Sequence, residues 1–424
     1  MSVVRKAAAI TALRIADALA DPAEVARRLP ADRRHTLGEG LAGTALLHAL
    51  LAGTVPGAAA RARAHWRLAA GTLGDAPPDG VWRGPGGLAA SLLAGSAHVS
   101  AAEGDGDAGR DVVRDAVRWL SARAEVLASC PWPGPAPGSA TCPWTVYDVT
   151  SGLGGTGRVL LAAYRTGWAD EAAPGLTAAL STLSHMVLCG TRDRPGWWQR
   201  PGHLPGPAPG RPEGSAVTGM AHGIAGPLAL LALAETSGPP VDGRRAAVRA
   251  AADWLLTVRE DLSWPARATA TAPATASRPG PGAGSGRRDA WCHGAPGIAR
   301  ALALASAALG DPAYAHVADL ALTALAERPG TAWDTAGAGL CHGSAGVLMC
   351  AVRGGHRPLA DGAAELTLRL APVPPPGPAG GPDAVGPGLG LLGGAAGTAL
   401  ALAQYAGLLP QSSPVPWDGL FLAV

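Results

Sequence analysis

The chain has 424 residues, of which 48% are apolar, 16% are charged and only 4% are aromatic, and its formal net charge is +2. The length permits a large buried core, and the nearly neutral charge gives no electrostatic reason to expect a nucleic-acid partner. Ala and Leu, which favour helices, are abundant, whereas β-branched and aromatic residues are sparse. The composition therefore predicts an all-α protein.

The N-terminus, Met1 to Ala7, lacks the order of basic, apolar and small residues that defines a signal peptide. We therefore expect a cytoplasmic protein with reduced thiols, in which six cysteines fit metal or catalytic use better than disulfides. One uncharged run, Ala384 to Leu409, is long enough to span a bilayer. Its glycines, Pro387, Gln404 and Tyr405 favour a buried helix, so we do not expect an integral membrane protein.

A Gly-x-x-Gly motif followed by an Ala/Leu-rich apolar segment recurs along the chain at intervals of roughly 45 to 70 residues. The seven copies begin at Gly40, Gly84, Gly152, Gly223, Gly294, Gly343 and Gly394. Amphipathic segments lie between them, for example Val3 to Leu19, Asp111 to Leu127, Arg244 to Arg259 and Ala313 to Glu327. Each repeat thus predicts an amphipathic outer helix, a glycine turn and an inner helix that is buried on all sides.

Seven inner helices surrounded by seven outer helices predict a double-layered α/α toroid, with residues 1–424 forming a single domain. An open helical solenoid is the alternative. Pro/Gly-rich stretches near residues 131–140, 200–215, 264–288 and 371–387 interrupt the repeats, and we expect them to be mobile loops. The third stretch directly precedes a Cys-His pair and is either a lid or a tolerated insertion.

Two of the motifs carry a Cys-His pair directly before the first glycine, Cys292-His293 and Cys341-His342. Cysteine and histidine are the ligands that zinc prefers, so these pairs predict a zinc site. Four protein ligands would make a structural site, whereas three with an open position would make a catalytic one, and the spacing alone does not decide between them. The alternative without a metal is that the two cysteines are buried core residues.

If the inner helices converge at one end, the polar residues beside the motifs share one rim. His222 directly precedes the fourth motif, and Tyr147-Asp148 lies shortly before the third. His222 is alternatively a histidine at a helix start, and Asp148 a helix cap. Trp144 and Trp291 either line a peptide groove or pack in the core. The remaining cysteines are expected to be small hydrophobic residues, and they are Cys130, Cys142, Cys189 and Cys350.

From near Gly40 to the C-terminus, the chain resembles the lanthionine synthetase C (LanC-like) family, the cyclases of lantibiotic biosynthesis. The resemblance is carried by Trp291-Cys-His-Gly294, Cys341-His-Gly343, Ala221-His-Gly223, Tyr147-Asp-Val-Thr-Ser-Gly152 and Trp417-Asp-Gly-Leu-Phe421. It implies a seven-fold α/α toroid that holds one zinc ion.

Carried over by motif, the resemblance implies that Cys292, Cys341 and His342 are the zinc ligands, and that His293 lies at a variable position outside the ligand set. It assigns the catalytic histidine to His222 and the catalytic aspartate to Asp148. Arg288 lies four residues before the first zinc cysteine, and the resemblance implies that it stabilises enolate charge or holds Asp148. The alternative is that Arg288 is a charged loop residue without a catalytic role.

The implied substrate is a ribosomal peptide whose serines and threonines have been dehydrated. Its cysteine thiolates would add to dehydroalanine or dehydrobutyrine and close thioether rings, with His222 as the proton donor. The implied partners are a separate dehydratase and a transporter, with membrane association only through such a complex. The interval from Leu88 to Asp148 is short for the extra domain that some members carry, so leader recognition is expected to differ.

Two other classes of function stay open at this point. One is a LanC-like protein that binds thiols or peptides as a scaffold of a modification complex without closing rings. The intact ligand trio together with His222 favours the cyclase, because a scaffold has no need of an acid beside the metal. The other is a toroidal glycosidase, which requires paired carboxylates; only Asp148 is found near the predicted rim.

Overall fold

The structure is a computed structural model that describes residues 2–73, 80–99, 106–130, 142–191, 193–200, 214–268, 289–371 and 388–424. The predicted loop 131–140 lies outside these residues, as do most of the predicted loops 200–215, 264–288 and 371–387. Within the described ranges, no helix combines the length and the apolar character needed to cross a membrane.

Each of the seven glycine motifs begins a helix, as predicted. The inner helices are α3 (Leu41–Leu50), α5 (Pro85–Gly95), α8 (Leu153–Arg165), α10 (Ala225–Ser237), α12 (Ala295–Leu309), α14 (Ser344–Arg353) and α16 (Ala395–Ala406). Every residue of α3 is buried, as expected for a helix that is apolar on all sides. The second glycine of the motif permits close packing: a Cβ at Gly297 would lie 2.1 Å from the carbonyl oxygen of Trp291.

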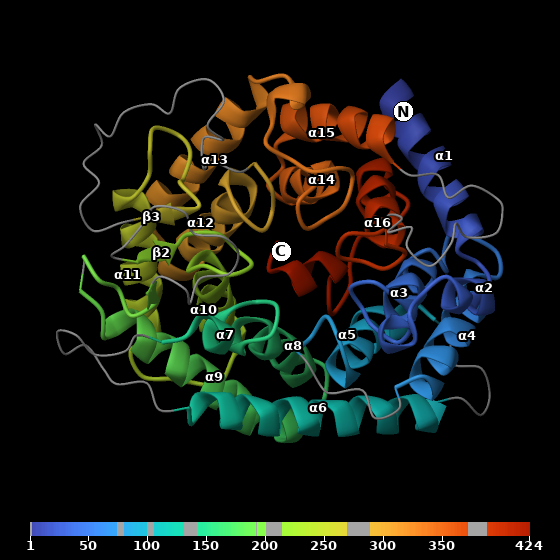
Figure 1. Ribbon diagram of the computed structural model, residues 1–424, viewed down its shortest axis with the longest axis horizontal. Helices are drawn as coiled ribbons and strands as arrows, with labels where there is room; N and C mark the ends of the chain where they lie inside the picture. The colour runs from blue at the N-terminus through green and yellow to red at the C-terminus, as the bar shows by residue number, and fades with distance from the viewer. Residues whose placement is uncertain are drawn as a thin grey trace. The chain divides into compact units, whose positions relative to one another are not determined.

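Seven further helices of the described residues alternate with the inner ones along the chain (Figure 1). They are α1 (Val3–Ala18), α4 (Ala58–Gly71), α6 (Gly106–Ala128), α9 (Ala169–Leu188), α11 (Arg244–Thr257), α13 (Pro312–Ala326) and α15 (Arg357–Leu370). Four of them, α1, α6, α11 and α13, coincide with the amphipathic segments named in the sequence. Short elements between them include α2 (Pro22–Arg27), α7 (Trp144–Tyr147) and the 3₁₀ helices Ala31–Arg33, Ser96–His98, Gly330–Ala332 and Trp417–Phe421.

The chain divides into two compact units, and the first comprises Met1–Trp119, Pro329–Thr331 and Thr335–Phe421. Its inner helices pack in the succession α14, α16, α3 and α5 (Figure 1). One backbone hydrogen bond joins each entry loop to the next. The amide of Cys341 donates to Leu392 (2.8 Å), that of Leu392 to Gly38 (2.9 Å) and that of Gly38 to Trp82 (3.1 Å). The loops therefore form one connected edge at the N-termini of these helices.

The second unit comprises Leu120–Arg328, Ala332–Asp334 and Leu422–Val424. Its inner helices α8, α10 and α12 pack in succession against α9, α11 and α13. The entry loops are connected in the same way as in the first unit. The amide of Val149 donates to the carbonyl of Ala221 (2.9 Å), and the amide of Ala221 donates to that of Cys292 (3.1 Å). The expectation that residues 1–424 form a single domain stays a prediction.

The second unit also contains a small antiparallel sheet that the sequence did not predict. Its strands are β1 (Trp198–Gln199), β2 (Ser215–Val217) and β3 (Arg267–Ala268), in the order β1-β2-β3, with Ala216 opposite Trp198 and Ala268. The first residues of the predicted loop 264–288 thus include a strand, β3. Trp264 is fully buried, and its indole donates to the carbonyl of Leu255 (2.8 Å), so an aromatic anchor orders this stretch.

Candidate metal centre

Cys292 lies in the turn that leads into α12. The turn is closed by a hydrogen bond from the amide of Ala290 to the carbonyl of His293 (3.1 Å). Gly294 has φ 122°, a conformation that favours glycine, and it sends the chain directly into the helix. Trp291 is fully buried, which supports packing rather than the lining of a groove, and Cys292 itself is 1% exposed. The Cys292 thiol is therefore held on a rigid, desolvated turn.

Cys341 and His342 lie in the equivalent turn before α14. The amide of Ala336 donates to the carbonyl of His342 (2.8 Å), and the amide of Cys341 donates to Leu392 (2.8 Å). Gly343 leads into the helix at Ser344. Both backbone bonds fix the turn, while Cys341 is half-buried and the imidazole of His342 is exposed. The two side chains are thus presented at the edge where the loops meet.

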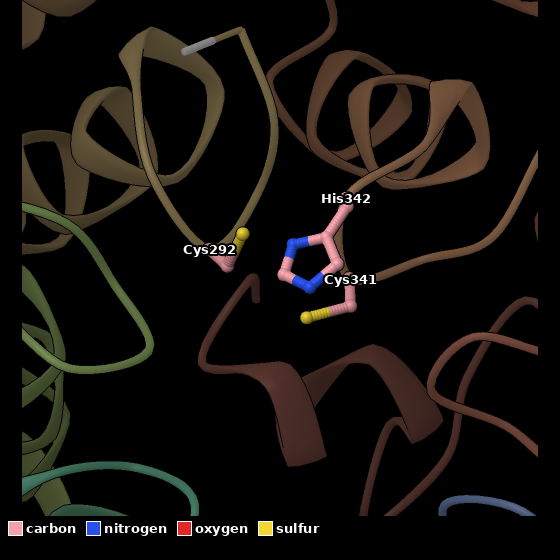
Figure 2. A group of neighbouring side chains, drawn as sticks. All are labelled: Cys292, Cys341 and His342. Atoms are coloured by element: carbon pink, nitrogen blue, oxygen red, sulfur yellow. The ribbon is translucent and has the colours of Figure 1, made fainter. Parts of the chain in front are cut away.

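The three ligand candidates point toward one another in Figure 2. One ligand atom each from Cys292, Cys341 and His342 lies within 4.8 Å of the other two. Sulfur and nitrogen ligands of a tetrahedral zinc ion are separated by about 3.5–4 Å, given zinc bonds of about 2.0–2.3 Å. Two thiols and one imidazole at this spacing suit a zinc ion, and within the described residues no further group of three potential ligands is found. His293 is not in the group.

His222 and Asp148 form a hydrogen-bonded pair next to the Cys292 turn. The Nδ1 of His222 lies 2.9 Å from Oδ2 of Asp148, and because a carboxylate accepts, Nδ1 carries the hydrogen. Nε2 is therefore the nitrogen that remains for chemistry. The His222 side chain is 25% exposed, and the preceding residue, Ala221, bonds directly to the carbonyl of Cys292. The structure thus brings the predicted histidine and aspartate together.

Asp148 is fully buried and accepts four short hydrogen bonds besides a longer one from the Ser151 hydroxyl. Its Oδ1 accepts the amides of Ser151 (2.9 Å) and Gly152 (2.7 Å), and its Oδ2 accepts the Thr150 hydroxyl (2.5 Å) besides His222. Asp148 therefore holds the turn that precedes α8 through its Oδ1 and contacts the His222 ring through its Oδ2, whereas the N-cap of α8 is Gly152, which has no side-chain cap. The hydrogen bond from Thr150 to this carboxylate was not predicted.

Two rings lie next to the imidazole of His222. Trp144 meets its ring edge-on at a centroid distance of 5.0 Å, and the ring of His293 lies at 6.1 Å. Trp144 is half-buried, so it remains a candidate to contact a peptide. Gly219 also lies close to the Cys292 turn, because a Cβ there would lie 2.4 Å from the carbonyl oxygen of Cys292. The backbone before His222 therefore approaches the Cys292 turn closely.

One anchor of the Cys292 turn was missed in the sequence. Asp289 is 3% exposed, accepts from the Arg328 guanidinium (2.7 Å) and accepts the amide of Asp334 (3.0 Å). Nothing in the local sequence distinguishes this carboxylate, because its partners are about 40 residues away in the chain. Its neighbour Arg288, predicted to be catalytic, lies outside the described residues.

The other four cysteines differ in their surroundings, and none of the six is in a disulfide. Cys142 and Cys350 are buried, as expected of small hydrophobic residues, and burial raises the pKa of Cys142 to about 12. Cys130, two residues after the end of α6, is exposed. Cys189 is half-buried and contacts the His185 ring one turn earlier (3.1 Å).

A loop-bound Cys, Cys, His group, a neighbouring His-Asp pair and seven glycine-started helices define the class of protein. Residues 32–352 match the model of the lanthionine synthetase C-like protein family, and the chain belongs to this family. No curated protein matches the sequence. Among solved structures, the chain is similar to nisin cyclase, at 18% identity with a TM-score of 0.72, over 96% of each chain. The predicted all-α fold class, the α/α toroid, is confirmed by this match.

Proposed function

We propose that this protein is a zinc-dependent lanthipeptide cyclase that forms lanthionine or methyllanthionine rings in a dehydrated precursor peptide. The observation that carries the proposal is the grouping of Cys292, Cys341 and His342 within 4.8 Å. The His222–Asp148 pair, bonded through Ala221 to the carbonyl of Cys292, adds a proton-transfer group beside it. Membership of the lanthionine synthetase C-like family supports the same substrate class.

Cys292, Cys341 and His342 would hold the zinc ion and leave one coordination position for the substrate. When bound, the ion supplies the Lewis acidity that favours the deprotonated form of a coordinated thiol at neutral pH. The burial of Cys292 keeps water from that side of the group, and the exposure of His342 leaves the other side accessible to a peptide.

The reaction adds the sulfur and hydrogen of a cysteine thiol across the carbon–carbon double bond of a dehydrated residue. The carbon–sulfur bond forms at the β-carbon, and a proton must reach the α-carbon, so the peptide keeps its atomic composition. His222 is the proposed donor at its Nε2, because Asp148 holds its Nδ1–H and stabilises the ring when both nitrogens are protonated. Arg288 is proposed to stabilise the enolate charge or to hold Asp148, as the resemblance implies.

The proposed partners follow from this chemistry. A separate dehydratase must supply the dehydrated serines and threonines. In this proposal, a transporter then exports the mature peptide. We place the reaction in the cytoplasm, where cysteine thiols stay reduced.

The first test is the zinc content of the purified protein and of the Cys341→Ala variant. We expect about one zinc per chain in the wild type and loss of the ion in the variant, which removes one of two thiolate ligands. Chelation should lower the unfolding temperature of the wild type and leave that of the variant unchanged, because a ligand that binds only the folded state stabilises it. Wild-type protein that binds no zinc when the metal is supplied would sink the proposal.

The second test separates a cyclase from a thiol-binding scaffold. Because ring closure leaves the mass unchanged, a dehydrated peptide with one cysteine is incubated with zinc-loaded protein and then alkylated. A cyclase makes the cysteine resistant to alkylation, so the mass spectrum shows one alkyl group fewer for each ring. A scaffold protects the thiol only while bound, so alkylation would be restored after the protein is denatured.

A further inference from the structure

The proposed zinc ligands lie on two turns that are far apart in the sequence, so the spacing between these turns decides whether an ion can bind. Cys292 belongs to the turn before α12, and Cys341 and His342 belong to the turn before α14 (Figure 2). Zinc bonds to sulfur and nitrogen measure about 2.0–2.3 Å, and a working site holds its ligand atoms to within about 0.5 Å. A shift of one turn by about 1 Å would therefore cost the ion a ligand.

One buried carboxylate connects the first turn to the chain segment that leads to the second. The side chain of Asp289, just before the Cys292 turn, is only 4% exposed. Its amide donates to the carbonyl of Asp334 (3.3 Å), and the amide of Asp334 donates back to Oδ2 of Asp289 (3.0 Å). The other oxygen, Oδ1, accepts from the Arg328 guanidinium (2.7 Å). Both oxygens of this carboxylate therefore hold the segment 328–334.

The segment held by this carboxylate continues directly into the second turn. One residue separates Asp334 from Ala336, whose amide donates to the carbonyl of His342 (2.8 Å). On the other side, the residue after the carboxylate is Ala290, whose amide donates to the carbonyl of His293 and closes the first turn (3.1 Å). Each step from one ligand turn to the other is thus either a covalent bond or a hydrogen bond.

The far end of the segment is anchored on α13. Trp333 is 7% exposed, and its indole donates to the carbonyl of Leu325 (3.1 Å). The amide of Arg328 donates to the same carbonyl (3.3 Å). Because the residues on both sides of the segment are held at the end of this helix, the guanidinium has a defined position from which to hold the carboxylate.

Stability alone does not account for a charged pair at this point. Removing a carboxylate from water costs free energy that its partner repays only in part, so a buried ion pair is weak evidence for stability. The Arg328 side chain is 45% exposed, so solvent also screens its attraction to Asp289. What the pair adds over an apolar contact is direction, because a hydrogen bond depends on angle as well as distance.

We propose that Asp289, supported by Arg328, is a positioning residue of the metal site and sets the distance between Cys292 and the pair Cys341 and His342. The inference rests on the proposed zinc site, to which it adds two residues that do not bind the ion. Residues that orient metal ligands without touching the metal typically contribute about 10- to 100-fold to metal affinity.

The experiment measures the zinc affinity of the full-length protein by competition with a chelating dye. Asp289→Asn keeps an oxygen for the Asp334 amide but loses the charge that holds Arg328, so we expect it to bind zinc about tenfold more weakly than the wild type. Arg328→Gln changes a half-exposed side chain and should weaken binding in the same direction. Arg328→Lys keeps the cation and should retain most of the affinity.

Cobalt(II) bound in place of zinc separates positioning from a general loss of stability. Its visible absorption depends on the ligands and on their geometry, so at saturating cobalt we expect Asp289→Asn to give a weaker and shifted spectrum. Glu235→Gln is the matched control, because it removes a similar ion pair, with Arg244 (2.8 Å), at the C-terminal end of α10 and in neither ligand turn. It should lower the unfolding temperature and keep the wild-type zinc affinity and cobalt spectrum.

Unchanged zinc affinity and an unchanged cobalt spectrum in both Asp289→Asn and Arg328→Gln would overturn the positioning role, and so would equal losses in Glu235→Gln. Thiol consumption by the wild type keeps this result separate from the proposed function. A wild type that binds zinc and consumes the thiol of a dehydrated peptide, with unaltered affinity in the variants, rejects the positioning role and leaves the cyclase in place. Weakened zinc binding in the variants of a wild type that consumes no thiol rejects the cyclase and retains the positioning role.

Discussion

At the scale of single residues, adjacent side chains of the same motif have different environments. Cys292 is buried and belongs to the ligand group, whereas the neighbouring His293 is half-buried and faces His222. In the second motif, both Cys341 and His342 belong to the group. The sequence spacing left this difference open, because the direction of a side chain in a turn depends on hydrogen bonds to other loops. The resemblance to known motifs, not the spacing, selected the three residues that the structure groups together.

His222 and Asp148 are expected to act as one unit. We predict that His222→Gln lowers kcat by about 10²–10⁴-fold, the range for loss of a general acid. Asp148→Asn should lower kcat less, because an amide oxygen still accepts from the backbone of Gly152 while the support of the His222 ring is lost. The loss in the double variant should be close to that in His222→Gln alone.

The rate is measured by thiol alkylation of a dehydrated peptide, with the zinc content determined in parallel. Both single variants should keep about one zinc per chain, because neither residue is among the three proposed ligands. His316→Gln, which changes an exposed histidine of α13, is the control. Losses that multiply fully in the double variant would show that the two residues act independently.

At the scale of the elements, the seven inner helices were predicted because a glycine turn and an apolar run repeat in register. The short strands were not, because β1 and β3 have two residues each and border Pro/Gly-rich sequence. No periodicity is detectable in so few residues. The buried side chain of Trp264, rather than a strand pattern, was the available signal that this stretch is ordered.

The close approach of two entry loops makes Gly219 a sensitive position. A Cβ at Gly219 would lie 2.4 Å from the carbonyl oxygen of Cys292 and 3.0 Å from the Cα of His293, so the Cys292 turn must move. We predict that Gly219→Ala destabilises the protein by about 1–3 kcal/mol, as overpacking does, and weakens zinc binding.

Gly53→Ala is the matched control, because a Cβ there meets no atom within 4 Å. Denaturant unfolding of the metal-free proteins gives the change in stability, and competition with a chelating dye gives the change in zinc affinity. If Gly219→Ala binds zinc as tightly as Gly53→Ala, the two loops are not coupled as the backbone contact indicates.

At the scale of the whole molecule, the fold is shared with nisin cyclase at 18% identity over 96% of each chain. Most of the particular side chains are therefore not needed to specify this fold. The fold buries few ionisable groups in the described residues, and the histidines of the first unit are an exception. His48 of α3 and His65 of α4 are 1% and 0% exposed, with their rings 5.1 Å apart.

These two histidines should make the protein sensitive to acid. Burial lowers the pKa of His65 to about 4, with the neighbouring His48 ring as a further cause, and burial also lowers the pKa of His48. In the unfolded chain both pKa values return to about 6.5. Between these values the unfolded state binds more protons, so the free energy of unfolding falls as the pH is lowered from 6.5 toward 4. For His65 the full effect is about 3 kcal/mol.

We therefore predict that His65→Gln flattens the pH dependence of stability over this range. Glutamine retains an amide that can bond to Thr44, whose hydroxyl lies 2.8 Å from Nδ1 of His65, but it does not titrate. The free energy of unfolding is measured by denaturant at several pH values between 4 and 7 on metal-free protein, so that protonation of the zinc ligands does not contribute. His316→Gln should keep the wild-type slope, and the same slope in His65→Gln would contradict the assignment of this acid sensitivity to the buried pair.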